Sequence, residues 1–111
     1  MQSSMIIPVG GKGATLHLAL LAHSDELARD RLRPMVVICP GGGYGFVSDR
    51  EAEPVAVRMN AYGFHAAVLR YSIAHARFPQ ALEELALAVA AVRDNAALWH
   101  VDTDRISVMG F

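Results

Sequence analysis

The sequence predicts an α/β fold in which a mostly parallel sheet is flanked by helices. Short apolar runs alternate along the chain with longer segments of helical period, and strands alternating with helices are joined by right-handed crossovers into a parallel sheet. The 111 residues are 53% hydrophobic and 19% charged, which favours a sheet buried on both faces. This length allows one domain at most, so residues 1–111 are treated as a single unit.

The first half of the chain predicts two strands. Residues 1–13 carry glycines without a clear period and are expected to form a loop or an arm. Residues 24–34 are polar and charged, and are expected to connect the two strands. Residues 35–39 are a short apolar run between two prolines, typical of a strand covered on both faces. Residues 14–23 alternate as a strand does, with three leucines on one face: Leu16, Leu18 and Leu20.

A helix and a third strand are expected next. Ser48 and Glu51 have the spacing of a capping box. Pro54 is tolerated only in the first turn of a helix, so the regular part is expected to begin at residues 51–53. Gly63 is a plausible left-handed cap at its end, and the following segment, FHAAVLRYS, has strand character.

The last third of the chain predicts the strongest helix and a final strand. Residues 79–99 have helical period, with Pro79 suited to the first turn. Residues 101–104 are expected to form a turn, and residues 105–111 to begin another buried strand. The predicted apolar stripe of the helix consists of Leu82, Leu85, Val89, Val92 and Ala96.

Charge and cysteine content exclude several classes of function. Ten basic and eleven acidic residues leave a net charge of −1, so nucleic acid is not expected as a partner. The single Cys39 excludes an internal disulfide. No segment is long and apolar enough to span a bilayer, and the first residues do not match a signal peptide. A cytoplasmic location without a membrane partner is therefore expected.

A glycine-rich loop, CPGGGYGF, directly follows the strand at residues 35–39. In open α/β sheets, ligands bind at the carboxyl ends of strands, and glycines let backbone N–H groups approach a ligand closely. Such a loop can cradle a phosphate or stabilise the oxyanion of acyl transfer. The phosphate interpretation is weak because the lysine and hydroxyl of a P-loop are missing. A tight turn that needs glycine for its shape alone is the third explanation.

A family resemblance is carried by two stretches, RPMVVICPGGGYGFVSDREAEPVAVRMNAYGFHAAVLRYSIA and FPQALEELALAVAAVRDNAALWHVDTDRISVMGF. Together they cover about three quarters of the chain. They resemble the N-terminal half of an α/β-hydrolase esterase, and most of all the acetyl-esterase and acetylxylan-esterase-like branch, which includes carbohydrate deacetylases. The resemblance implies an incomplete α/β-hydrolase domain, a small-molecule or carbohydrate ester as substrate, and no cofactor or metal.

The resemblance also assigns roles in the glycine loop. In that family, the amides of a His-Gly-Gly-Gly or Pro-Gly-Gly-Gly loop form part of the oxyanion hole. By this match, Gly42 and Gly43 are the best donors and Gly41 shapes the turn. The amide of Tyr44 is a possible substitute donor.

The end of the sequence matches the start of a nucleophile elbow. Gly110 and Phe111 match the first two positions of Gly-x-Ser-x-Gly. The serine would be the next residue, and the acid and histidine of the triad follow the serine in chain order. The 111-residue chain is therefore expected to be inactive by itself, and its last strand to leave an apolar sheet edge open to self-association.

Other candidate residues are interpreted as structural. Ser48 is expected to cap a helix, and the segment it begins, residues 48–51, to be a solvated helix start rather than the mouth of the site. Arg70 is expected to pair with a nearby carboxylate in a buried position, and Cys39 to be a small core residue. The remaining residues weighed as catalytic groups are also expected to be structural: His65, His75, His100, Ser72 and Ser107.

The preferred hypothesis is thus the N-terminal portion of a serine esterase or carbohydrate O-deacetylase. The alternative is a non-enzymatic α/β module that binds an anion or an acyl ligand through the glycine loop. Activity that depends on a serine beyond Phe111 distinguishes the two hypotheses.

Overall fold

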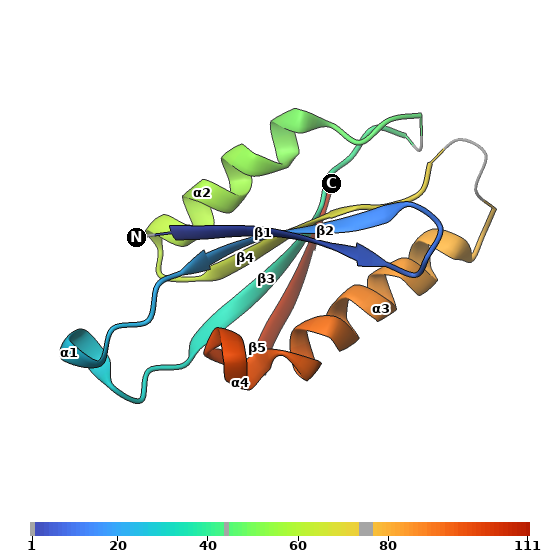
Figure 1. Cartoon of the computed structure of the whole chain (residues 1–111). Helices are drawn as coiled ribbons and strands as arrows, with labels where there is room; N and C mark the ends of the chain where they lie inside the picture. The colour runs from blue at the N-terminus through green and yellow to red at the C-terminus, as the bar shows by residue number, and fades with distance from the viewer. Residues whose placement is uncertain (1, 44, 74–76) are drawn as a thin grey trace.

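A computed structural model describes residues 2–43, 45–73 and 77–111 as a five-stranded sheet with helices against both faces (Figure 1). The strands lie in the order β1-β2-β4-β3-β5, and the predicted α/β class is confirmed. Their bounds are Gln2–Val9 for β1, Ala14–Leu21 for β2, Arg33–Cys39 for β3, His65–Arg70 for β4 and Val101–Gly110 for β5.

The sheet is mixed, and its parallel part consists of the strands that alternate with helices. β3 pairs in parallel with β4 on one side and with β5 on the other. β1 and β2 form an antiparallel hairpin, and β2 continues antiparallel onto β4. The parallel arrangement of β3, β4 and β5 agrees with the crossover argument, because a helix separates each of these strands from the next.

The expectation of a loop or arm over residues 1–13 is wrong for Gln2–Val9, which form β1. Val9 pairs with Ala14 across a four-residue turn, in which Gly10, Gly11 and Gly13 have positive φ angles. Glycine adopts this conformation without steric cost. β1 has no clear apolar period because it is an edge strand, where Pro8 is also tolerated.

Helix α2, Glu53–Ala61, covers one face of the sheet, after a short 3₁₀ turn at Asp49–Glu51 (η1). Side chains of β3 alternate between the two faces, which confirms that this strand is covered on both sides. The core under α2 is formed by Val36, Ile38, Ala52, Ala56, Ala66 and Val68.

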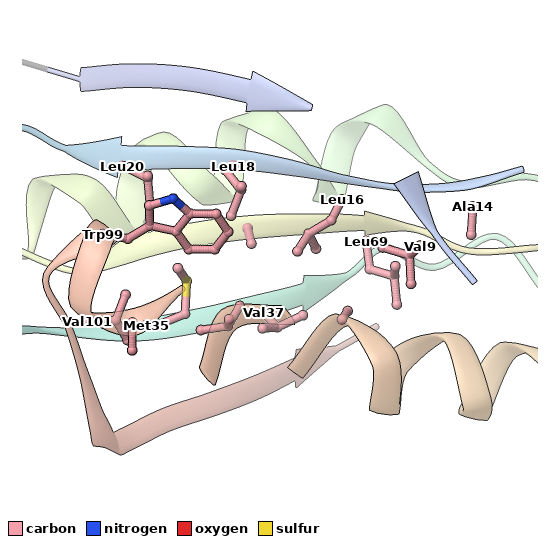
Figure 2. Packing of buried hydrophobic residues seen from close by; sticks show 14 residues of the cluster. Val9, Ala14, Leu16, Leu18, Leu20, Met35, Val37, Leu69, Trp99 and Val101 are labelled. Atoms are coloured by element: carbon pink, nitrogen blue, oxygen red, sulfur yellow. The ribbon is translucent and has the colours of Figure 1, made fainter. Parts of the chain in front are cut away.

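Helices α3, Gln80–Asp94, and α4, Ala96–Trp99, cover the opposite face. Trp99 is buried there among the leucines of β2, together with Met35 and Val37 of β3 (Figure 2). The predicted face of Leu16, Leu18 and Leu20 is confirmed, since all three are buried. A short helix, α1, Asp25–Ala28, lies in the connection between β2 and β3. Among the described residues, no helix is both long and apolar enough to cross a membrane.

Three features of the last third differ from expectation. The predicted helix over residues 79–99 is interrupted at Asn95, whose side-chain amide donates to the Ala91 carbonyl at 2.8 Å. Leu82 is exposed although it was assigned to the apolar stripe, and Glu84 is buried in its place. Residues 101–104 were expected to be a turn, but they begin β5, where the pairing with β3 is irregular between Arg33 and Met35.

Candidate functional site

The glycine loop begins at the carboxyl end of β3, the strand between β4 and β5. From β3 the chain crosses over one face through α2 to reach β4. It then crosses the other face through α3 and α4 to reach β5, on the opposite side of β3 (Figure 1). The crossovers thus diverge at the end of β3, which is the topological switch point where α/β sheets bind ligands.

The loop has a conformation that favours glycine at two positions, for different reasons. Gly42 has φ +145°, and a methyl group added to it would clash with the Phe46 carbonyl oxygen. The Gly45 N–H donates to the Gly42 carbonyl at 3.0 Å and closes the turn. Gly43 has φ +61°, but an added methyl group would meet no atom within 4 Å. Gly42 is therefore required by both space and backbone angle, and Gly43 by backbone angle alone.

The backbone amides of the loop have different partners. The Gly41 N–H donates to Oε1 of Glu51 at 3.0 Å. Within the described part of the chain, no hydrogen bond engages the N–H groups of Gly42 and Gly43. These two amides are the predicted oxyanion donors, and that role stays a prediction. Tyr44, the possible substitute donor, lies outside the described residues.

The end of β5 lies directly beside this loop. Gly110 is paired with Cys39 at the end of β3, and the Phe111 N–H donates to the Cys39 carbonyl at 3.2 Å. A methyl group on Gly41 would lie 3.2 Å from the Phe111 carbonyl oxygen. The fold therefore brings together the predicted oxyanion loop and the predicted start of the elbow, which are about 70 residues apart in the sequence.

Ser48 and Glu51 form a cap that differs from a capping box. The Ser48 hydroxyl accepts a hydrogen bond from the Arg50 N–H at 3.3 Å, which confirms its capping role. The Ser48 N–H donates to the Gly41 carbonyl at 2.8 Å and is not bonded by Glu51. Glu51 instead binds the Gly41 amide. The predicted reciprocal bond is therefore wrong, because the glycine loop supplies partners to both residues.

Two further side chains hold the loop from the end of β4. The Tyr71 hydroxyl donates to the Pro40 carbonyl at 2.5 Å. Arg70 lies 2.9 Å from a carboxylate oxygen of Asp49, and its guanidinium also donates to the Val47 carbonyl at 3.4 Å. Arg70 was expected to form a buried pair, but Asp49 is 91% exposed. The pair is therefore a surface ion pair with a small stabilising effect.

A buried carboxylate joins α3 to the end of β4. Glu84 is 3% exposed and accepts hydrogen bonds from the Ser72 N–H at 2.7 Å and the Ser72 hydroxyl at 2.5 Å. The Gln80 side-chain amide donates to the same hydroxyl at 2.8 Å. Ser72 is thus held as a structural residue, as expected. The sequence pattern did not predict the partners of Glu84, Glu51 and Tyr71, because the polar groups that they bind are distant along the chain.

His65, His100 and Cys39 have surroundings that do not suit catalytic groups. His65 binds the Leu21 amide and the His100 carbonyl, and the His100 ring stacks on His23 at 3.9 Å. Burial raises the pKa of the Cys39 thiol, which disfavours a nucleophilic thiolate. His75 lies outside the described residues. Within the described ranges, no three His, Cys, Asp or Glu residues are grouped closely enough to hold a metal ion.

A cavity of about 760 Å³ opens beside the end of β5. It lies against the first turns of α3, where the exposed Leu82 forms part of its wall. Its lining is mainly apolar and also includes Cys39, Leu69, Tyr71, Phe78, Leu85 and Phe111.

The chain is similar to several known hydrolases. The model of the BD-FAE family matches residues 22–111. The solved structure of MGS-M1, an α/β-hydrolase enzyme from a Medee basin deep-sea metagenome library, is 40% identical, with a TM-score of 0.91. The carboxylesterase Cest-2923 from Lactobacillus plantarum is 29% identical, with a TM-score of 0.88. An acetyl ester-xyloside bifunctional hydrolase from Caldicellulosiruptor lactoaceticus is 27% identical, with a TM-score of 0.86.

A further relative is endo-1,4-β-xylanase B of Butyrivibrio fibrisolvens, which is 31% identical over 93 residues. The match covers 80% of this chain and 14% of the xylanase. The three solved structures are matched over 96%, 100% and 96% of this chain, and over 45%, 42% and 42% of their own lengths. The chain thus spans less than half the length of each of these relatives.

Proposed function

Because the chain belongs to the BD-FAE family of α/β-hydrolases, we propose that it is the N-terminal portion of a serine hydrolase acting on carboxylic esters. The observation that carries the proposal is the glycine loop at the end of β3, with the end of β5 beside it. An acetyl ester, carried on a carbohydrate, is the proposed substrate. The named activity of the Caldicellulosiruptor relative supports the acetyl group, and the xylanase relative supports the carbohydrate.

The proposed reaction is acyl transfer through a serine. The serine of the elbow would follow Phe111, and its hydroxyl would attack the ester carbonyl while a histidine takes the hydroxyl proton. The carbonyl π electrons move to the carbonyl oxygen, and the amides of Gly42 and Gly43 stabilise this oxyanion. The alcohol then leaves with the proton that the histidine returns, and water releases the acid from the acyl-enzyme by the same steps.

Three described residues near the glycine loop that carry a hydroxyl or thiol are not placed to act as the nucleophile. The hydroxyl of Ser72 is bound to a buried carboxylate, and that of Ser48 caps η1. Burial raises the pKa of the Cys39 thiol. We therefore expect the 111-residue polypeptide to be inactive, because the serine, acid and histidine lie outside it.

The test compares the full-length protein with the 111-residue polypeptide, using an activated acetate ester and a fluorophosphonate probe. We expect turnover and labelling of one serine in the full-length protein only, with the serine directly after Phe111 identified by mass spectrometry. Turnover by the 111-residue polypeptide, or a labelled residue within 1–111, would overturn the proposal. A full-length protein that binds acetate but does not hydrolyse the ester would favour the alternative, a non-enzymatic binding module.

A pair of glycine variants tests the loop in the full-length protein. In Gly42→Ala the added methyl group clashes with the Phe46 carbonyl, and we expect kcat to fall by about 100-fold or more, as when an oxyanion donor is lost. Gly43→Ala is the matched variant, since its methyl group has free space around it and only the backbone angle is strained. Equal effects of the two substitutions would contradict the geometry given for the loop.

A further inference from the structure

We propose that Glu51 is a positioning residue, which fixes the glycine loop by accepting the Gly41 amide and so presents the Gly42 and Gly43 amides to the substrate. The inference rests on the proposed function, because it concerns the same oxyanion loop. Glu51 acts through the backbone and not by contact with the ester. It therefore differs from the nucleophile, the general base and the oxyanion donors.

The contact is direct and specific to one carboxylate oxygen. Oε1 of Glu51 accepts the Gly41 N–H at 3.0 Å, and it lies 2.7 Å from the point where a Cβ of Gly41 would be. Glu51 is half-buried, and the ion pairs of the described residues do not include its carboxylate. A hydrogen bond of this length restricts the direction of the Gly41 N–H, because the interaction weakens steeply when donor and acceptor are misaligned.

The bond fixes the residue from which the donor amides extend. The Ser48 N–H holds the Gly41 carbonyl at 2.8 Å, and the Tyr71 hydroxyl holds the preceding carbonyl of Pro40 at 2.5 Å. With its N–H and its carbonyl both bound, Gly41 cannot rotate without breaking a hydrogen bond. Gly42 and Gly43 follow Gly41 directly, so the fixed orientation of Gly41 also restricts the direction of their amides. Oxyanion stabilisation depends on donors that are oriented before the reaction begins.

The negative charge of Glu51 is not what the loop needs. An additional negative charge near a developing oxyanion opposes it, whereas a hydrogen-bond acceptor that orients the loop assists it. Two small substitutions therefore separate a role of the acceptor's position from a role of its charge. Glu51→Gln keeps the length of the side chain and an acceptor oxygen but loses the charge. Glu51→Asp keeps the charge but is one methylene too short to reach the Gly41 amide in the same position.

The experiment measures both variants in the full-length protein, with kcat expressed per active serine titrated by the fluorophosphonate. We expect Glu51→Asp to lower kcat by about 10- to 100-fold, as a misplacement of about 1 Å does. KM for the acetate ester is expected to change by about twofold or less, because substrate binding precedes oxyanion formation. Glu51→Gln is expected to keep kcat within about threefold of wild type. Glu53→Asp and Glu53→Gln are the matched controls, since Glu53 is exposed.

The outcomes separate this inference from the proposed function. If wild type turns over the ester and Glu51→Asp keeps its kcat per titrated serine, the positioning role is wrong and the function stands. A purely structural role would lower the fraction of titratable serine and leave kcat per serine unchanged. If Glu51→Gln is as impaired as Glu51→Asp, the charge is required and the inference is also wrong. A wild-type protein without turnover or a titratable serine overturns both proposals.

Discussion

His65 is a buried histidine that connects the start of β4 to the end of β2 and to the junction between α4 and β5. It is 1% exposed at the start of β4. Its Nδ1 accepts the Leu21 N–H of β2 at 3.0 Å, so Nε2 carries the proton and donates to the His100 carbonyl at 3.2 Å. Burial lowers the pKa of His65, and the positive charges of Arg33 and His100 lower it further, although the bond to the His100 carbonyl acts in the opposite direction.

This depressed pKa predicts acid destabilisation. The folded state holds His65 neutral, so its contribution to stability is complete above the unfolded pKa of about 6.5 and is lost as the pH falls below it. Protonation of Nδ1 would also break the bond to Leu21. One such group changes the free energy of unfolding by at most about 1.4 kcal/mol per pH unit. Urea unfolding between about pH 7.5 and 5 measures this slope.

The variant for comparison is His65→Gln, which offers one acceptor and one donor but does not titrate in this range. Burial and Arg70 also lower the pKa of His17, so both proteins should carry His17→Gln to remove that contribution. We expect the His65→Gln protein to have the shallower dependence on pH. Equal slopes for the two proteins would show that His65 is not responsible.

Sequence reasoning succeeded with individual residues where the partner was near in the chain. Ser48 was predicted as a cap and binds the amide two residues later. Glu51 was assigned to the same cap by its spacing, but the Gly41 amide, ten residues away, binds it instead. The partner of Glu51 depends on how the loop folds back over η1, and one-dimensional spacing does not contain that information.

Helix α3 shows how a buried polar residue changes the face that a helix presents. Hydrophobicity predicted a stripe through Leu82 and left Glu84 outside it. In the structure Glu84 faces the end of β4, where the backbone and hydroxyl of Ser72 bind it, and Leu82 is exposed. A carboxylate can be buried when its hydrogen bonds compensate the loss of water, and an apolar pattern cannot reveal such partners. The positions of Leu85, Val89 and Val92 were predicted correctly because they pack on apolar side chains.

Glu84→Ala tests the anchor between α3 and β4. The substitution leaves the part-buried N–H and hydroxyl of Ser72 without their acceptor. The loss of a charged acceptor, which leaves its donors without a hydrogen bond, lowers the free energy of unfolding by about 2 to 4 kcal/mol. We expect a decrease of that size in the free energy of unfolding, measured by urea denaturation. Glu83→Ala, at the exposed neighbouring position, should change it by about 0.5 kcal/mol or less. Similar losses in the two variants would show that the anchor does not contribute.

The order of the strands in the complete sheet could not be predicted from local sequence patterns. Alternating strands and helices predicted the α/β class and placed the glycine loop at a strand end, and both are observed. The hairpin of β1 and β2 and the antiparallel junction of β2 with β4 were not predicted. The hairpin is local, but β1 lacks the apolar alternation that would have revealed it. The junction of β2 with β4 joins segments about 50 residues apart, and such pairing is chosen by the packing of the whole sheet.

β5 forms an open edge of this sheet in the 111-residue chain. It is ten residues long, and among the described residues β3 is the only strand that pairs with it. Val108 on this strand is 49% exposed, and Phe111 just after it is also exposed. A long exposed edge strand with unpaired backbone donors and acceptors is a template for pairing with another chain. We therefore expect the 111-residue polypeptide to self-associate through β5.

Val108→Lys tests this expectation, because a lysine on an edge strand opposes the approach of a second strand. Sedimentation velocity of the 111-residue polypeptide should show dimers or larger species that dissociate with dilution, and the variant should shift toward the monomer. Val57→Lys is the matched control, since Val57 is 51% exposed but lies on α2, away from the edge. A wild-type polypeptide that stays monomeric, or equal dissociation in both variants, would show that β5 does not mediate association.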